Sequence, residues 1–79
     1  MTYKIQSVIF NKHYYTFNEA KKFIKKNGYK IGRIDITKNY YRFRQLEPTY
    51  LLQQQYNKIR TKKLNAGIKL ILYLSLIHI

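Results

Sequence analysis

Residues 33–44 read RIDITKNYYRFR, and this stretch decides how the chain folds. Apolar and charged side chains alternate in it with the period of two that is typical of β-strands, on both sides of the polar pair Lys38-Asn39. A two-residue turn at that pair predicts a hairpin, because Asn at the second turn position tolerates the positive φ required there. A slip of one residue would mix apolar with charged side chains, so the pattern itself selects the register. That register places Ile36 opposite Tyr41, Asp35 opposite Arg42, Ile34 opposite Phe43 and Arg33 opposite Arg44.

One face of this hairpin is basic and carries a tyrosine. Arginines neutralise phosphates and a tyrosine ring stacks on an unpaired base, so this face predicts contact with nucleic acid. We expect two cations of a later strand to join the same surface, with Lys4 and Gln6 as neighbours. Asp35 either orients Arg42 or forms an ordinary cross-strand ion pair that relieves repulsion between arginines. The predicted nucleic-acid-binding residues are Arg33, Tyr40, Arg42, Arg44, Arg60 and Lys62.

The segment before the hairpin, TFNEAKKFIKKNG at 16–28, predicts an amphipathic helix over about 17–27. Thr16 and Glu19 have the spacing of a capping box, and Gly28 follows as a residue that takes positive φ at little cost. The expected apolar face consists of Phe17, Ala20, Phe23, Ile24 and Asn27. The other face carries Lys21, Lys22, Lys25 and Lys26, either as a second phosphate-binding patch or as the solvated side of the helix.

The remaining segments complete a single sheet. The expected order is β-α-β-β-(short α)-β-β, which is an α+β fold with one mainly antiparallel sheet and one amphipathic helix on one face. The other face of the sheet is expected to be open and to carry the arginines. Further predicted elements are a strand at 3–10, a short helix begun by Pro48 with Leu51 and Leu52 inward, a strand within 56–64 with Ile59 and Thr61 inward, and a strand at 68–73 whose Leu70 and Leu72 join the core.

The composition fits a small basic domain and argues against several classes of site. The chain has 79 residues, with 16 Lys and Arg against 3 Asp and Glu, and a net charge of +13. Three carboxylates, three glycines and no cysteine argue against a two-metal nuclease site, a Rossmann fold and a zinc module. The first residues lack the apolar core of a signal peptide, and the apolar run at 68–79 is too short for a transmembrane helix. We expect a protein that is not secreted and that needs no metal, cofactor, small-molecule substrate or membrane.

The last six residues, LSLIHI at 74–79, match one reading frame of a widely used transposon-based sequencing adapter. We expect them to be adapter read-through rather than native sequence, so the predicted domain spans residues 1–73. Ser75 and His78 are therefore left out of all chemistry. The alternative is a genuine apolar end of a strand.

The sequence predicts no catalytic residue and no enzyme. His13 is the only candidate for acid–base chemistry, and a lone histidine in a loop is a weak catalytic signal. Glu19 already has a capping role, and Glu47 precedes a proline. A minimal ribonuclease that uses His13 is therefore the least favoured hypothesis.

Five segments together resemble a small uncharacterised domain found in tailed-phage and giant-virus proteins. They lie at 15–20, 23–30, 39–45, 60–64 and 67–71, and the most specific is Tyr-Arg-Phe-Arg-Gln at 41–45. The resemblance covers about residues 3–73, and Phe23 stands where that family often has Trp. It implies a viral or phage origin, with the host cytoplasm or the virion as location, and implies no activity. It marks Arg42, Arg44, Gln45, Arg60 and Thr61 as residues to test.

The stretch 23–44 is also similar to small toxin ribonucleases with a double-stranded-RNA-binding-like fold. Those proteins place a histidine on the strand after the helix, whereas residues 29–46 hold none, so we expect no shared catalysis.

Two hypotheses for the function are favoured. One is a viral or phage module that binds nucleic acid without catalysis, and the other is a virion assembly module in which the same face docks an acidic protein surface.

Overall fold

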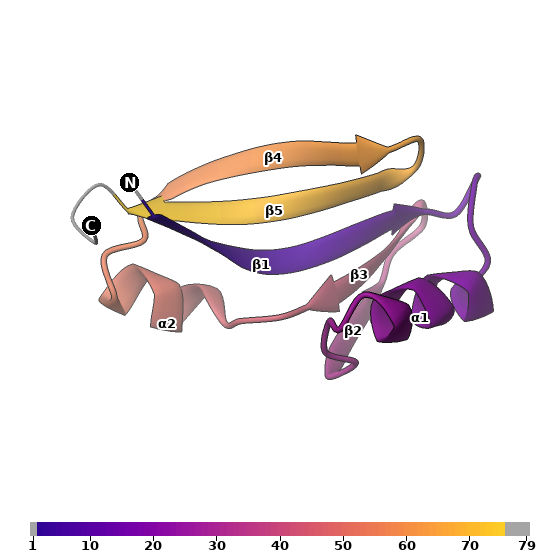
Figure 1. The fold of residues 1–79 in the computed structure, drawn as a ribbon, viewed down its shortest axis with the longest axis horizontal. Helices are drawn as coiled ribbons and strands as arrows, with labels where there is room; N and C mark the ends of the chain where they lie inside the picture. The colour runs from indigo at the N-terminus through magenta and orange to yellow at the C-terminus, as the bar shows by residue number, and fades with distance from the viewer. Residues whose placement is uncertain (1, 76–79) are drawn as a thin grey trace.

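The alternating segments pair into one antiparallel sheet in the computed structural model, which describes residues 2–75 (Figure 1). The strand order across this five-stranded sheet is β2-β3-β1-β5-β4, so the first strand of the chain lies at its centre. The predicted element order and the α+β class are confirmed. The elements are β1 (Thr2–Asn11), α1 (Phe17–Lys26), β2 (Arg33–Ile36), β3 (Tyr40–Arg44), α2 (Pro48–Gln53), β4 (Lys58–Asn65) and β5 (Ile68–Ser75).

The hairpin of β2 and β3 has the register that the alternation predicts. Ile34 pairs with Phe43 and Ile36 with Tyr41. The turn itself differs from the prediction, because Asn39 is not among the positive-φ residues of the described chain. Instead, the Thr37 hydroxyl accepts a hydrogen bond from the Tyr40 N–H at 3.1 Å, and the Thr37 N–H donates to the Tyr40 carbonyl at 2.9 Å. The side chain of Thr37 thus replaces a backbone acceptor and removes the need for a left-handed residue.

Helix α1 follows the predicted signals at both ends. The Thr16 hydroxyl accepts from the Glu19 N–H at 3.2 Å, and the Glu19 carboxylate accepts from the Thr16 N–H at 2.9 Å, which completes the capping box. Gly28 follows the helix with a φ of +75°. Asn27 was expected on the apolar face, but it is exposed and caps the helix by donating to the Phe23 carbonyl at 2.9 Å.

The first face of the sheet, defined here as the one that α1 covers, holds the main core. Ala20 and Ile24 of α1 are fully buried on it. Three aromatic rings, those of Phe23, Phe43 and Tyr15, meet the ring of Phe10 edge-on at 5.5–5.6 Å between centroids. The other fully or nearly fully buried residues of this cluster are Val8, Ile68 and Leu70.

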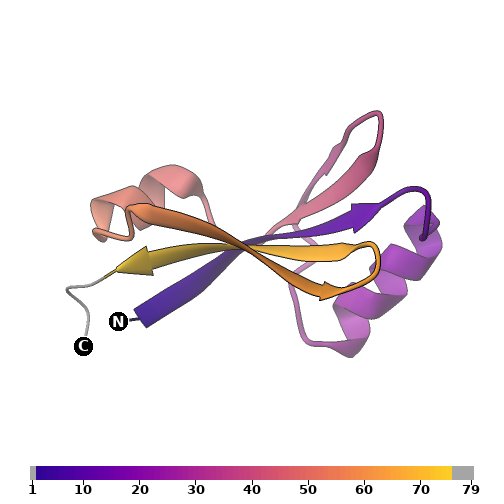
Figure 2. The same ribbon diagram turned by 90° about the horizontal axis from the view of Figure 1, so that it is seen from above.

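The second face of the sheet is not fully open, which corrects the prediction. Figure 2 shows α2 and α1 near opposite ends of the twisted sheet and on opposite sides of it. Leu51 of α2 is fully buried against Tyr56 and Tyr73, and Tyr73 alternates along β5 with the first-face residue Leu72. Only one of the two predicted inward leucines is buried, since Leu52 is 50% exposed. The end of the second face that holds Tyr73 therefore lies under α2. The opposite end, which holds Ile9 and Arg42, is left uncovered (Figure 2) and is called the open half below.

Strand β4 is the second departure from the predicted core. All eight of its residues are exposed, including Ile59 and Thr61, which were expected to point inward. It is an edge strand that pairs with β5, and neither helix covers it. Its lysines and arginine are the charged side chains with which natural proteins protect such an edge from pairing with another chain.

The strand β5 is longer than the predicted strand at 68–73. Leu74 and Ser75 of the adapter-like segment complete it and are nearly buried. The rest of that segment, 76–79, which includes His78, lies outside the described residues.

Candidate functional site

The residues predicted to bind nucleic acid lie in three different settings. Arg33 and Arg44 belong to an ion-pair network, whereas Tyr40 and Arg42 border the open half of the second face. Arg60 and Lys62 pair with Leu72 and Leu70, whose side chains join the first-face core. Directly paired residues of an antiparallel sheet point to the same side, so Arg60 and Lys62 lie on the first face. The expected single surface is thus divided between both sides of the sheet.

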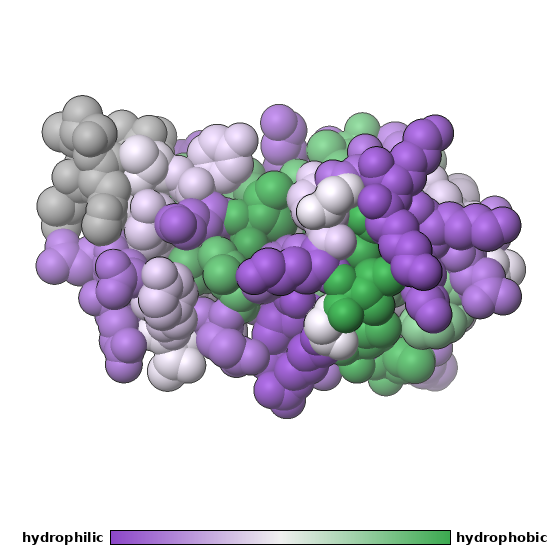
Figure 3. All heavy atoms as spheres, turned by 60° about the horizontal axis from the view of Figure 1, so that its bottom comes forward, coloured by the Kyte–Doolittle hydropathy of each residue, from purple (hydrophilic) through white to green (hydrophobic). Residues whose placement is uncertain are grey.

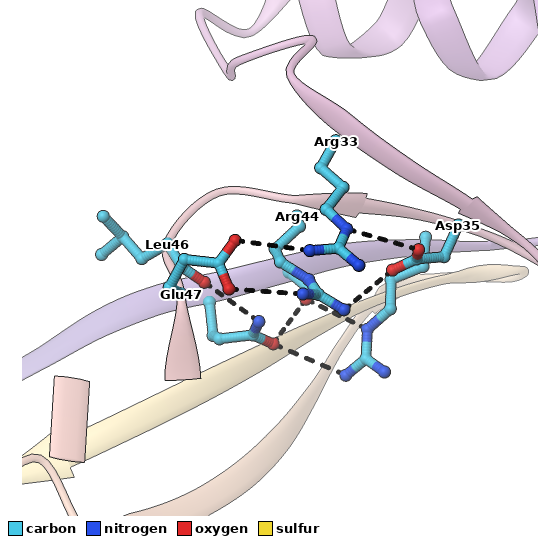
Figure 4. A network of polar contacts seen from close by, with 8 residues as sticks. Arg33, Asp35, Arg44, Leu46 and Glu47 are labelled. Carbon is cyan, nitrogen blue, oxygen red and sulfur yellow. Dashed lines mark hydrogen bonds and ion pairs between the residues drawn. The ribbon is translucent and has the colours of Figure 1, made fainter. Parts of the chain in front are cut away.

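Two of the predicted phosphate-binding arginines are already neutralised by carboxylates (Figure 4). Arg44 reaches Asp35 at 3.0 Å and Glu47 at 3.4 Å, and its side chain is only 20% exposed. Arg33 contacts the same two carboxylates at 3.9 Å each. Two arginines and two carboxylates cancel in charge, so this network adds no net attraction for an anion. Asp35 consequently pairs with Arg44 and Arg33, and the alternative in which it orients Arg42 is not realised.

Arg42 is held in place without an acid. Its Nε donates to the Ser7 hydroxyl at 3.1 Å and its Nη2 to the Gln6 side-chain oxygen at 3.5 Å. Both partners are buried, and the strand register of β1 shifts between Ile5 and Ser7, which leaves Gln6 as an extra residue. Such a β-bulge redirects side chains, and here it presents two neutral acceptors to one guanidinium. No carboxylate within residues 2–75 pairs with Arg42, so it keeps its full charge in a fixed position.

Arg42 is the first of three cations that lie in one line across the second face. Arg42 pairs with Ile9, Ile9 pairs with Lys69, and Lys69 pairs with Lys63. We call Arg42, Lys69 and Lys63 the basic row. Strands lie about 4.8 Å apart, so the row spans roughly 15 Å. Neither lysine is among the predicted binding residues, although the alternation of Lys69 with the core residues Ile68 and Leu70 already places it on the opposite face from them.

A shallow hollow of about 180 Å³ lies beside this row. Tyr40 and Arg42 border it, and the Lys69 ammonium lies 5.2 Å from the centroid of the Tyr40 ring. Ile9, with its aliphatic side chain, forms the apolar part of its lining, and Thr37 adds a hydroxyl. The hollow thus combines an aromatic ring, an apolar surface and cations at one place.

The first side of the molecule carries a separate set of cations. Figure 3 shows hydrophilic side chains gathered at the end of the molecule where α1 lies. Lys22, Lys25 and Lys26 of α1 are exposed, and Lys21 is half-exposed with its ammonium 5.6 Å from the Phe17 ring centroid. These lysines fit the solvated side of an amphipathic helix.

The acid–base candidates have simple local roles. His13 lies in the exposed turn after β1, where its backbone N–H donates to the Asn11 side-chain oxygen at 2.8 Å. The hydrogen bonds from the Thr16 N–H and hydroxyl hold the pKa of the Glu19 carboxyl below its ordinary value.

Among residues 2–75, no group of three His, Asp or Glu side chains could hold a metal ion. In the same range, neither helix is long and apolar enough to cross a membrane.

Comparison of the chain with protein-family models, with curated proteins and with solved structures gives no significant match. The resemblance to the phage and giant-virus domain therefore stays a prediction.

Proposed function

We propose that this chain is a small non-catalytic module that binds nucleic acid through the open half of its second sheet face. The phosphate contacts come from the basic row of Arg42, Lys69 and Lys63. The observation that carries this proposal is the setting of Arg42, which is fixed by the neutral partners Ser7 and Gln6 and keeps its charge. A guanidinium fixed in this way presents its remaining N–H groups in the planar arrangement that suits phosphate.

The pairing of Lys69 with Lys63 supports the same conclusion. Like charges directly opposite each other in an antiparallel pair destabilise the sheet. A phosphate bound along the basic row relieves this repulsion, because its negative charge attracts both ammonium groups. The net charge of +13 adds a long-range attraction that speeds encounter with a polyanion.

The proposal is tested by titrating labelled single-stranded RNA, single-stranded DNA and duplex DNA at two salt concentrations with heparin as competitor. The test variant is the double substitution Arg42→Ala/Lys69→Ala, and the matched control is Lys25→Ala/Lys26→Ala on α1, which removes the same charge. Each phosphate contact contributes about 0.7–0.9 to the slope of log affinity against log salt. We expect the test variant to lower this slope by roughly 1.4–1.8 and the control to lower it much less.

Two outcomes contradict the proposal. A folded Arg42→Ala/Lys69→Ala protein that keeps the affinity and the salt slope of the parent would show that the basic row does not contact phosphate. Equal losses in the test and control variants, with binding that heparin abolishes for every polyanion, would show that the attraction is generic. The second result favours the alternative in which this face docks an acidic protein surface, such as that of a virion component.

A second variant tests whether Arg42 must be held in position. Ser7→Ala removes the acceptor of the Arg42 Nε hydrogen bond without changing any charge. We expect weaker binding with an unchanged salt slope, because the number of cations stays the same. The matched control is Thr61→Ala, which lies on the same face, is exposed and pairs with Ile71 away from Arg42. Urea denaturation of both variants shows whether weaker binding comes from a displaced Arg42 guanidinium or from a less stable fold.

A further inference from the structure

The hollow beside the basic row is bordered by two side chains of the same strand. Tyr40 and Arg42 are two residues apart on β3 and point to the same face, so they start about 7 Å apart along the strand. Arg42 bends away from Tyr40, since its guanidinium bonds to Ser7, which pairs with Arg44 on the far side. Ile9 pairs with Arg42 and lies in the floor between the two walls.

The hollow suits one flat ring by its volume. A cavity of about 150 Å³ holds a benzene molecule, whereas drug-sized ligands occupy about 300 Å³ or more. The hollow of about 180 Å³ therefore fits a single ring system rather than a larger ligand.

The lining indicates what is attached to that ring. Ile9 and the Tyr40 ring favour an apolar or aromatic surface, whereas Lys69 and Arg42 at the border favour an anion. In the free chain the Lys69 ammonium covers the Tyr40 ring at 5.2 Å. An aromatic ring stacked on Tyr40 takes the place of this half-buried cation–π contact, and the flexible lysine then reaches the anion beside it.

We infer that the hollow takes one unpaired nucleobase, stacked on Tyr40 and facing Arg42, with the adjoining phosphate on Lys69. The inference rests on the proposed function and names its substrate class, which is single-stranded nucleic acid. Bases inside a duplex are stacked on their neighbours and cannot enter the hollow, so a duplex retains only the phosphate contacts. Either RNA or DNA supplies the required base and phosphate.

The test compares a short single-stranded oligonucleotide with an abasic strand that carries the same number of phosphates. Aromatic stacking on a base gives a gain of at least about 5-fold in affinity for the intact strand. Tyr40→Leu removes the ring without changing the charge, so we expect it to abolish this gain and leave the salt slope unchanged. Tyr40→Phe keeps the ring and is expected to keep the gain. Parallel RNA and DNA strands show which backbone is preferred.

Equal affinity of the parent protein for intact and abasic strands would overturn the inference without using any variant. The inference also fails if the Tyr40→Leu protein retains the full difference in affinity between the two strands. Either result leaves the proposed function standing, provided that Arg42→Ala/Lys69→Ala still lowers the salt slope. If Arg42→Ala/Lys69→Ala leaves the salt slope unchanged, by contrast, the proposed function itself is contradicted.

Discussion

Arg42 and Arg44 lie two residues apart on the same face of one strand, yet their partners make them different groups. Arg42 donates to a hydroxyl and an amide, whereas Arg44 donates to two carboxylates. A hydrogen bond to a neutral acceptor fixes a guanidinium and leaves its charge, but a carboxylate fixes it and cancels the charge. The two arginines look alike in the sequence, because most of their acceptors lie on other strands, at 6–7 and at 35, and only Glu47 is close to Arg44 along the chain.

We predict that Arg44 contributes more to the stability of the fold than Arg33 does. Arg44→Ala removes a largely buried side chain that joins Asp35 and Glu47, so we expect it to lower the free energy of unfolding by about 1–2 kcal/mol. Arg33→Ala, at 62% exposure and 3.9 Å from the same carboxylates, is expected to change it by less than about 0.5 kcal/mol. Urea denaturation measures both changes, and equal losses would show that Arg44 contributes no more to stability than Arg33 does.

At the scale of elements, local signals predict structure well and long-range pairing limits the prediction. Helix α1 and the hairpin of β2 and β3 follow from capping, alternation and a turn, all within a few residues of each other. The face of each β4 residue depends instead on its register with β5, which shifts between Lys63 and Asn65. This irregularity places Lys63 in the basic row and moves Lys62 to the first face. The coverage of the second face by α2 likewise depends on contacts between Leu51 and Tyr73, which no local pattern shows.

The cap of α1 gives a pH-dependent contribution to stability that can be measured. The pKa of Glu19 is lowered in the folded chain by the Thr16 hydrogen bonds, so its contribution is present above the ordinary pKa of the carboxyl and is lost as the pH falls through the lowered value. Glu19→Gln does not titrate, so we expect it to be less stable than the parent at pH 7 and to approach the parent near pH 3. Urea midpoints across this range test the prediction, and a constant difference would contradict it.

At the scale of the whole molecule, the charge divides between two sides of a thin sheet. The basic row lies on the second face, whereas the α1 lysines, Arg60 and Lys62 lie on the first. With only three acids in the chain, most of these cations repel one another. A domain of this size buries only about 60–65% of its unfolded surface, so self-repulsion is a noticeable fraction of its stability. Salt therefore stabilises the fold by screening, and we expect a bound polyanion to stabilise it by the same physical route.

Salt and a bound polyanion compete with each other as stabilisers of the fold. Added NaCl screens the repulsion within the free chain, so we expect its Tm to rise between 50 and 300 mM. A single-stranded oligonucleotide at 100 times its Kd adds about 2.7 kcal/mol at low salt, which corresponds to a rise in Tm of roughly 10–20 °C. Because salt weakens phosphate contacts, the Tm of the complex falls with salt at a fixed oligonucleotide concentration until it meets the rising curve of the free chain. Thermal melts of both samples over this range test the expectation. A Tm of the free chain that falls with salt would mean that the Arg33–Asp35–Arg44–Glu47 network, rather than repulsion, dominates the electrostatics of the fold.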